Sequence, residues 1–224
     1  MRLHLGLIFV LCTALSLEAK KHPHQGKLPS YIGEPPSISL SKSEQAQVDK
    51  GEPVYLKVKD GRGSGGLATA VFKVNAPPER VWRILKNFES YPKWIPELQV
   101  AEVYKREDNN VFGHFYYRKN FFIKAEYYIK HVVSSEPNRW ITWTLDYDNR
   151  SDFHDNVGFW KVREVANNPN ICIVDYQIQI KLKGFKNLLV SFVETEGLKE
   201  ATAWLRPAAE SREASVSSNT PKQK

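Results

Sequence analysis

The side chains that could carry acid–base chemistry are three histidines and three aspartates near the middle of the chain. They are His114, His131, His154, Asp146, Asp152 and Asp155. His131 continues the alternation of Tyr127 and Ile129, which places it on the apolar face of a predicted strand. It is therefore the best single candidate for a general acid or base. A core histidine with a hydrogen-bond partner gives the same pattern, and we favour that structural interpretation.

Metal and cofactor motifs are weak or absent. Asp152-Phe153-His154-Asp155 could suggest a metal ligand set, but one histidine between acids on a turn-prone segment is usually solvated. The glycine-rich segment 60–66 precedes a strand-like stretch rather than Lys-Ser/Thr and a helix, which predicts a hairpin turn instead of a phosphate loop. No nucleophile elbow and no His-Glu-x-x-His pattern occurs. We expect no cofactor, no metal and no catalytic residue, with an enzyme as the alternative.

The N-terminus has the pattern of an export signal. An almost unbroken apolar run over residues 5–17 follows a basic start and precedes Ala19 and a polar shift. A helix that crosses a bilayer needs about 20 residues, so we predict a signal peptide over residues 1–19 rather than an anchor. Cleavage after Ala14 is an alternative. Removal of this segment leaves Cys172 as the only cysteine, so no intrachain disulfide can form.

Composition is that of a globular protein with one main domain. Hydrophobic residues make up 42% of the 224 residues and charged residues 25%. The formal net charge is +7, but basic residues alternate with acids and form no run of five. Together with the export signal, this pattern argues against a nucleic-acid partner. It favours a soluble protein with a basic surface, for which we expect transient contact with anionic membrane surfaces.

The first part of the chain predicts an arm that leads into a domain. Residues 20–63 form the predicted arm, with a proline-rich loose segment over 20–40 and a short helix over 42–50. Ser41 and Glu44 make a capping box for this helix, and a β-prone stretch covers residues 53–58. A strand over 67–74 follows. Asn75 is a candidate cap for the next helix, which Pro92 ends.

The second part predicts a meander covered by a helix. The buried face of the helix that begins after Asn75 consists of Val81, Ile84, Leu85 and Phe88. Six strand-like runs follow at 98–105, 111–118, 121–133, 139–147, 157–165 and 171–183. Short connections imply antiparallel pairing, and alternation implies one wet face and one covered face. A helix over 185–206 supplies the cover, Pro207 ends it, and residues 207–224 form a disordered tail.

Two motifs carry a resemblance to a known family. They are residues 74–82 (VNAPPERVW) and 88–96 (FESYPKWIP), and Gly158-Phe159-Trp160 adds to them. With them the sequence resembles the START-like (SRPBCC) superfamily, in the branch of polyketide cyclases/dehydrases and lipid transport that includes coenzyme Q-binding proteins. The resemblance spans residues 64–206. It implies an α+β helix-grip, in which a seven-stranded curved antiparallel sheet surrounds a long C-terminal helix.

The resemblance also implies a cavity between the sheet and the C-terminal helix. The expected ligand-binding residues are Phe88, Tyr91, Trp94, Tyr127, Ile129, Trp143, Leu145, Trp160, Tyr176, Leu189 and Phe192. Burial of ten methylenes of a ligand there would contribute about 8 kcal/mol. We expect a monomeric, exported carrier of a hydrophobic small molecule such as a lipid, quinone, sterol or polyketide, periplasmic or secreted. A cyclase or dehydratase, or a module that binds a protein partner, are the alternatives.

Overall fold

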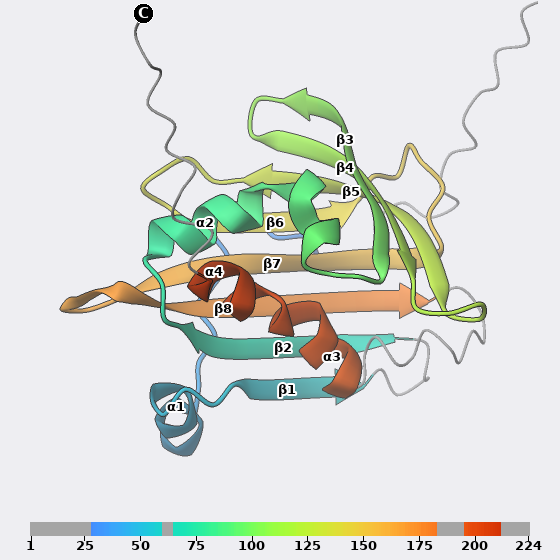
Figure 1. The fold of residues 1–224 in the computed structure, drawn as a ribbon. Coiled ribbons are helices and arrows are strands. Elements are labelled where there is room, and N and C mark those ends of the chain that lie inside the picture. The colour runs from blue at the N-terminus through green and yellow to red at the C-terminus, as the bar shows by residue number, and fades with distance from the viewer. Residues whose placement is uncertain (1–27, 60–64, 183–194, 212–224) are drawn as a thin grey trace, which may run out of the picture.

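An antiparallel sheet with all but the first of the described helices across one face forms the core of the protein (Figure 1). The computed structural model describes residues 28–59, 65–182 and 195–211. The helices are α1 (Lys42–Asp49), α2 (Pro78–Lys86), the 3-10 helix η1 (Phe88–Lys93), α3 (Thr195–Ala203) and α4 (Leu205–Glu210). The strands are β1 (Val54–Lys59), β2 (Gly65–Val74), β3 (Leu98–Glu107), β4 (Asn110–Arg118), β5 (Lys124–Val133), β6 (Trp140–Leu145), β7 (Phe153–Val165) and β8 (Asn168–Leu182).

Within the described residues the sheet has eight strands in the order β1-β2-β8-β7-β6-β5-β4-β3, one more than we predicted from the sequence. The extra strand is β1, which we had assigned to the arm. It pairs with β2 from Val54 opposite Val71 to Lys59 opposite Gly66, as a hairpin requires. Without it, the outer edge of β2 would expose unpaired backbone groups. The remaining strands confirm the predicted antiparallel meander and the helix-grip arrangement.

Helix α2 begins at Pro78, with proline in the first turn as predicted. Its N-cap is Pro77 rather than Asn75, whose backbone N–H instead donates to Glu210 Oε1 at 2.8 Å. The predicted buried face is confirmed, because its four apolar side chains are all less than 9% exposed. The helix ends at Lys86, before Pro92, and the chain continues as η1. This turn of 3-10 helix brings Phe88 and Tyr91 over the sheet.

The C-terminal cover consists of two short helices where the described residues begin again at 195. Pro207 does not end the helix. It lies in the first turn of α4, and the break falls at Trp204. A proline lacks the N–H that would bond the carbonyl of Ala203, and its ring crowds that carbonyl, so α3 cannot continue through this position. Ala208 and Ala209, which we had placed in a disordered tail, are buried. Residues 185–194 of the predicted helix lie outside the described residues.

The arm over residues 28–40 crosses the face of the sheet opposite the helices, behind the sheet in the view of Figure 1. The backbone N–H of Leu28 donates to Asp155 Oδ2 at 2.8 Å, and that of Ile38 donates to Asp175 Oδ2 at 3.3 Å. The Tyr31 ring packs edge-on against Phe159, with 4.9 Å between ring centroids. The described part of this arm is therefore attached, not loosely packed as its proline-rich sequence predicted.

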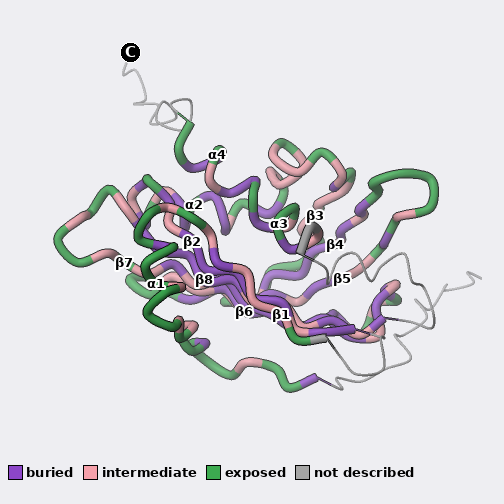
Figure 2. Tube along the Cα trace, turned by 90° about the horizontal axis from the view of Figure 1, so that it is seen from below, coloured by how far each residue is buried: buried purple, intermediate pink, exposed green. Residues whose placement is uncertain are grey.

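Helix α1 begins at the predicted capping box: Ser41 Oγ accepts from the N–H of Glu44, and Glu44 Oε2 accepts from the N–H of Ser41 at 2.7 Å. Its Val48 joins Val71 and Ile173 in a small apolar cluster on the outer face of the sheet. The main core lies on the other face, between sheet and helices, as the distribution of buried residues shows (Figure 2). In the described part of the chain, none of the helices has the length and apolarity needed to span a membrane. The predicted signal peptide lies outside that part.

Candidate functional site

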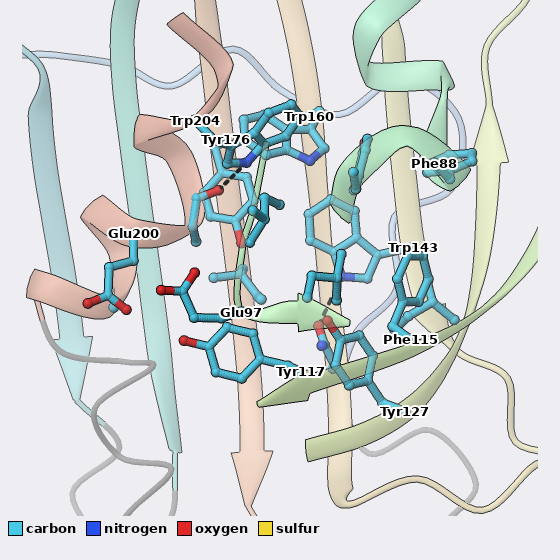
Figure 3. A pocket seen from close by; sticks show the side chains of 18 of the residues that line it. Phe88, Glu97, Phe115, Tyr117, Tyr127, Trp143, Trp160, Tyr176, Glu200 and Trp204 are labelled. Carbon is cyan, nitrogen blue, oxygen red and sulfur yellow. Dashed lines mark hydrogen bonds between the residues drawn. The ribbon is translucent and has the colours of Figure 1, made fainter. Parts of the chain in front are cut away.

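The main core is not filled completely: a cavity of about 180 Å³ lies between the concave face of the sheet and the segments η1 and α3 (Figure 3). Strands β4 to β8 supply one wall, and the helical segments supply the other. The lining residues are Phe88, Tyr91, Ile95, Glu97, Leu98, Phe115, Tyr117, Tyr127, Ile129, His131, Trp143, Asn156, Trp160, Tyr176, Ile178, Gly197, Glu200, Ala201 and Trp204. The set is dominated by aromatic and aliphatic side chains.

Strand alternation positions the aromatic wall. Trp143, Trp160 and Tyr176 stand on neighbouring strands β6, β7 and β8 and face the same side. The ring centroids of Trp160 and Tyr176 are 4.3 Å apart, and those of Trp143 and Tyr176 are 5.9 Å apart. Trp204, just after α3, closes the side of the cavity opposite the sheet. Its ring centroid is 6.4 Å from that of Trp160. These rings hold one another in place and leave room between them.

Gly158 makes space for Trp143. A Cβ atom at this glycine would lie 2.3 Å from Cζ2 of Trp143 and 2.3 Å from the backbone oxygen of Gln177. The indole therefore lies directly against the β7 backbone, where its Nε1 donates to Asn156 Oδ1 at 2.9 Å. The glycine of the Gly-Phe-Trp motif is needed for this close approach.

His131 is the one predicted acid–base candidate that lines the cavity. Its ring stacks on Phe88, with 4.2 Å between centroids, and its Nδ1 lies 3.3 Å from the carbonyl oxygen of Val111. Burial lowers the pKa of His131 to about 3, which the hydrogen bond to Val111 only partly opposes. The imidazole is therefore neutral near pH 7, and it acts as a hydrogen-bonding part of an aromatic wall.

Two tyrosine hydroxyls add polar groups to this wall. Burial raises the pKa of both Tyr127 and Tyr176, so both hydroxyls keep their protons. Within the described residues, neither hydroxyl makes a hydrogen bond, whereas the Tyr91 hydroxyl donates to the carbonyl oxygen of Leu85 at 2.7 Å. Tyr127 and Tyr176 can therefore donate to, or accept from, a neutral oxygen of a bound molecule.

The carboxylates of the cavity lie together at one end, apart from the tryptophans (Figure 3). Glu97 and Glu200 flank Tyr117 there. Burial, followed by the proximity of the two carboxylates, raises the pKa of Tyr117 to about 12. Glu200 also pairs with Lys119, at 2.5 Å between Oε1 and Nζ. We call Glu97, Tyr117 and Glu200 the acidic rim.

The structure brings seven of the predicted ligand-binding residues to the cavity. They are Phe88, Tyr91, Tyr127, Ile129, Trp143, Trp160 and Tyr176. Trp94 lies behind the wall and stacks on Trp204, with 5.7 Å between centroids. Leu145 is 1% exposed and packs inside the core, one step beyond Trp143 on the same face. Leu189 and Phe192 lie outside the described residues. Ligand binding by the seven stays a prediction.

Sequence reasoning missed several lining residues. Phe115 and Tyr117 alternate on β4 and could have been found from that pattern, as Trp204 could from helical spacing. Asn156 was missed because the strand predicted over 157–165 begins after it, whereas β7 already begins at Phe153. Nothing local marks Glu97 or Glu200 as cavity residues, since their position depends on how distant segments meet.

The other acid–base candidates lie away from the cavity. His114 pairs with Glu126 at 2.9 Å, and Asp152 Oδ2 accepts from the backbone N–H of Glu126. Asp155 accepts from the Tyr147 hydroxyl at 2.6 Å, and Asp146 accepts from Asn149. The described residues therefore place none of these acids beside His131, and they contain no group of three or more residues able to hold a metal.

We expect acidification to destabilise the protein partly through His131. The unfolded chain takes up a proton near the ordinary histidine pKa of about 6.5, whereas the native state does so only near pH 3. Stability should therefore fall between those values, by at most about 1.4 kcal/mol per pH unit. Urea unfolding as a function of pH measures this slope, and His131→Phe should reduce it.

The matched control for this prediction is Ile129→Val, which trims a buried side chain on the same face of β5 as His131 and removes no titratable group. It should leave the pH slope close to that of the unmodified protein. An unchanged slope in His131→Phe would show that His131 is not held neutral in the native state.

Comparisons with known proteins agree with this geometry. The family model described as polyketide cyclase / dehydrase and lipid transport matches residues 67–210. No curated protein matches the chain. Among solved structures, the Thermus thermophilus protein TTHA0849 is 20% identical, with a TM-score of 0.55, and the match covers 64% of this chain and 97% of that one.

Two further structures are similar in fold. Human StAR-related lipid transfer protein 5 is 14% identical, with a TM-score of 0.54, and the match covers 70% of this chain and 82% of that chain. A Streptomyces aromatase/cyclase is 11% identical, with a TM-score of 0.52, and the match covers 70% and 94% of the two chains. At these identities the matches show a shared fold alone, which is the helix-grip that we expected from the sequence. Because the family model covers more than half of the sequence, the chain belongs to the polyketide cyclase/dehydrase and lipid transport family.

Proposed function

We propose that this protein is a non-enzymatic carrier that holds a hydrophobic small molecule between its sheet and its C-terminal helices. The observation that carries the proposal is the cavity of about 180 Å³, whose walls are mostly aromatic. An apolar cavity of about 150 Å³ stays dry and binds benzene. The cavity described here therefore accommodates a ring-sized apolar group, and a longer molecule would extend past the acidic rim.

The polar groups of the cavity favour a neutral molecule. The carboxylate of Glu97 would repel an anionic head group at the rim, whereas Lys119 offsets the charge of Glu200. Deeper in the cavity, the hydroxyls of Tyr127 and Tyr176, which have no hydrogen-bond partner among the described residues, offer hydrogen bonds to a carbonyl or hydroxyl oxygen. Quinones, sterols and polyketides combine rings with neutral oxygens, and they fit this pattern better than free fatty acids do.

The acid–base groups that line the cavity favour a carrier over a cyclase or dehydratase. His131 is the only histidine among the described lining residues, and its pKa of about 3 makes it a weak base. Its Nδ1 already faces the Val111 carbonyl rather than a carboxylate. Turnover of a supplied polyketide substrate that is abolished by His131→Ala would reverse this preference.

The proposal includes export of a monomeric chain to the periplasm or the medium. Its support is the apolar run over residues 5–17 with a small residue before the polar shift, which is typical of a cleaved signal. The intact mass of the mature protein would show whether cleavage occurs after Ala19 or Ala14.

The test is extraction of the natively purified full chain with organic solvent, followed by mass spectrometry of the extract and of the intact complex. We expect a neutral hydrophobic molecule, at most one per chain. Protein that is consistently free of ligand and takes up neither quinone nor neutral lipid would contradict the proposal.

Variants of the two tyrosines test whether their hydroxyls recognise a polar oxygen on the ligand. Wild-type protein should bind naphthol more tightly than naphthalene, and the double change Tyr127→Phe with Tyr176→Phe should reduce that preference, because the two deep hydroxyls that can meet the naphthol oxygen are then missing. Tyr116→Phe, on the opposite face of β4, should leave it unchanged. Equal preference in all three proteins would exclude a role of the two hydroxyls in recognition.

A further inference from the structure

The turn between β4 and β5 exposes an aromatic pair. Phe121 and Phe122 are each 76% exposed, and their rings meet edge to face with 5.3 Å between centroids. The other large hydrophobic side chains that are exposed in the described chain, such as Ile32 and Val58, stand singly. Two adjacent exposed phenylalanines form a small apolar surface that the fold itself does not cover.

This turn has a defined conformation. Asn120 Oδ1 accepts from the backbone N–H groups of Phe122 at 2.9 Å and of Ile123 at 2.8 Å. The N–H of Lys119 also donates to the carbonyl oxygen of Ile123 at 2.9 Å. The asparagine thus closes the turn on its own backbone and presents both rings outward.

Cations flank the aromatic pair. Arg118 and Lys124 stand directly opposite each other on the last rung of the β4–β5 ladder. Like charges in this position destabilise a hairpin, so folding alone does not explain them. In the described part of the chain, neither side chain forms an ion pair, whereas the neighbouring Lys119 is paired with Glu200. We call residues 118–124 the hairpin tip.

The hairpin tip adjoins the acidic rim, the end of the cavity at which the Glu200 side chain is 46% exposed to solvent. Tyr117 of the acidic rim immediately precedes the tip, and the Lys119–Glu200 pair joins the tip to α3. Figure 1 shows the β4–β5 turn projecting at the end of the sheet where β8 ends. A surface that met the tip would therefore lie next to the opening through which a ligand extends.

We propose that the hairpin tip docks on an anionic lipid bilayer, with Phe121 and Phe122 in the interfacial region and Arg118 and Lys124 at lipid phosphates. Aromatic rings with adjacent cations are the chemistry that binds membrane interfaces, and the formal charge of +7 adds a general attraction to anionic lipid. The tip projects as a narrow turn, which inserts between head groups more readily than it forms a broad protein interface. The inference that this docking serves ligand exchange rests on the proposed function.

The test is co-sedimentation of the full chain with vesicles of phosphatidylcholine alone and of phosphatidylcholine mixed with phosphatidylglycerol. We expect binding to the mixed vesicles that weakens with salt. Phe121→Ser with Phe122→Ser should lower it at least about tenfold. Arg118→Gln with Lys124→Gln should reduce the preference for the anionic lipid, and the remaining net charge should preserve part of it. Ile32→Ser, which changes a single exposed apolar residue on the arm, is the control and should bind as wild type does.

Naphthol binding to the same variants separates docking from ligand binding. Loss of vesicle binding with unchanged naphthol affinity supports the docking surface and shows that the variant is folded. Absence of naphthol binding in wild-type protein that still binds vesicles would overturn the proposed function and leave the docking intact. Docking is overturned if the phenylalanine variant binds vesicles as wild type does, or if wild type binds neither vesicle. It is also overturned if the phenylalanine change converts a dimer to a monomer, since the tip would then be a contact between copies.

Discussion

Gly158→Ala is expected to lower the free energy of unfolding by about 3 kcal/mol, the upper part of the range for an overpacked core. The added methyl group would lie 2.3 Å from both the Gln177 backbone oxygen and the Trp143 ring. The backbone oxygen belongs to the central β7–β8 pair and cannot move without breaking the ladder. Trp143 would be pushed toward the cavity, so naphthol binding should weaken as well. Equilibrium unfolding in urea measures the first effect.

Gly113→Ala is the matched control, because this glycine also lies inside a strand but its Cβ would meet only a side chain closely. The nearest atom would be Cε2 of Phe115 at 2.7 Å, and the nearest backbone atom, the oxygen of Glu102, would be at an ordinary 3.6 Å. The phenyl ring can turn aside, so we expect a loss of about 1 kcal/mol. If the two alanine variants were equally stable, close packing of Trp143 on β7 would not be a constraint on the fold.

Ala201→Phe is expected to weaken naphthol binding at least about tenfold, which corresponds to about 1.4 kcal/mol. Ala201 lies on α3 and lines the cavity, so a phenyl ring attached there occupies the space that a ligand ring would use. Because the ring fills a space that is otherwise open, the free energy of unfolding should stay equal or rise. Isothermal titration calorimetry and urea unfolding measure the two effects.

Ala203→Phe provides the control on the same helix. Ala203 is exposed, so the added ring should change neither naphthol affinity nor the cavity. Equal losses of affinity in the two variants would indicate a general effect on α3. Undiminished binding in Ala201→Phe would place the ligand elsewhere in the molecule.

Local patterns were sufficient to predict most of the elements. The alternation through Tyr127, Ile129 and His131 fixes β5 and its cavity face, and the apolar spacing after Pro78 fixes α2. The hairpin turn predicted over residues 60–66 already indicated that the β-prone stretch over 53–58 pairs with the next strand, but we had assigned that stretch to the arm and did not count it in the sheet. By contrast, attachment of the arm depends on Asp155 and Asp175, residues more than a hundred positions away.

The site divides in the same way. The aromatic wall could be predicted from alternation, which tells which side chains share one face of a strand. Alternation does not tell which of them reach the cavity and which are covered by other side chains. Depth separates Trp143, which lines the cavity, from Leu145, which is covered. The acidic rim forms only where the loop before β3, which carries Glu97, meets helix α3, which carries Glu200. The role of Gly158 depends on the indole of Trp143, which lies on the neighbouring strand. Both depend on three-dimensional packing and leave no local signal in the sequence.

The account rests on unfilled apolar space between the sheet and α3, and xenon binding to crystals of the protein under pressure would test that space most directly. Dry apolar cavities bind xenon, whereas filled or hydrated ones do not. We predict a xenon site bordered by Phe88, Trp143 and Tyr176, which disappears in Ala201→Phe and persists in Ala203→Phe. Side chains packed without a gap at this position, or ordered water in place of xenon, would contradict the central claim.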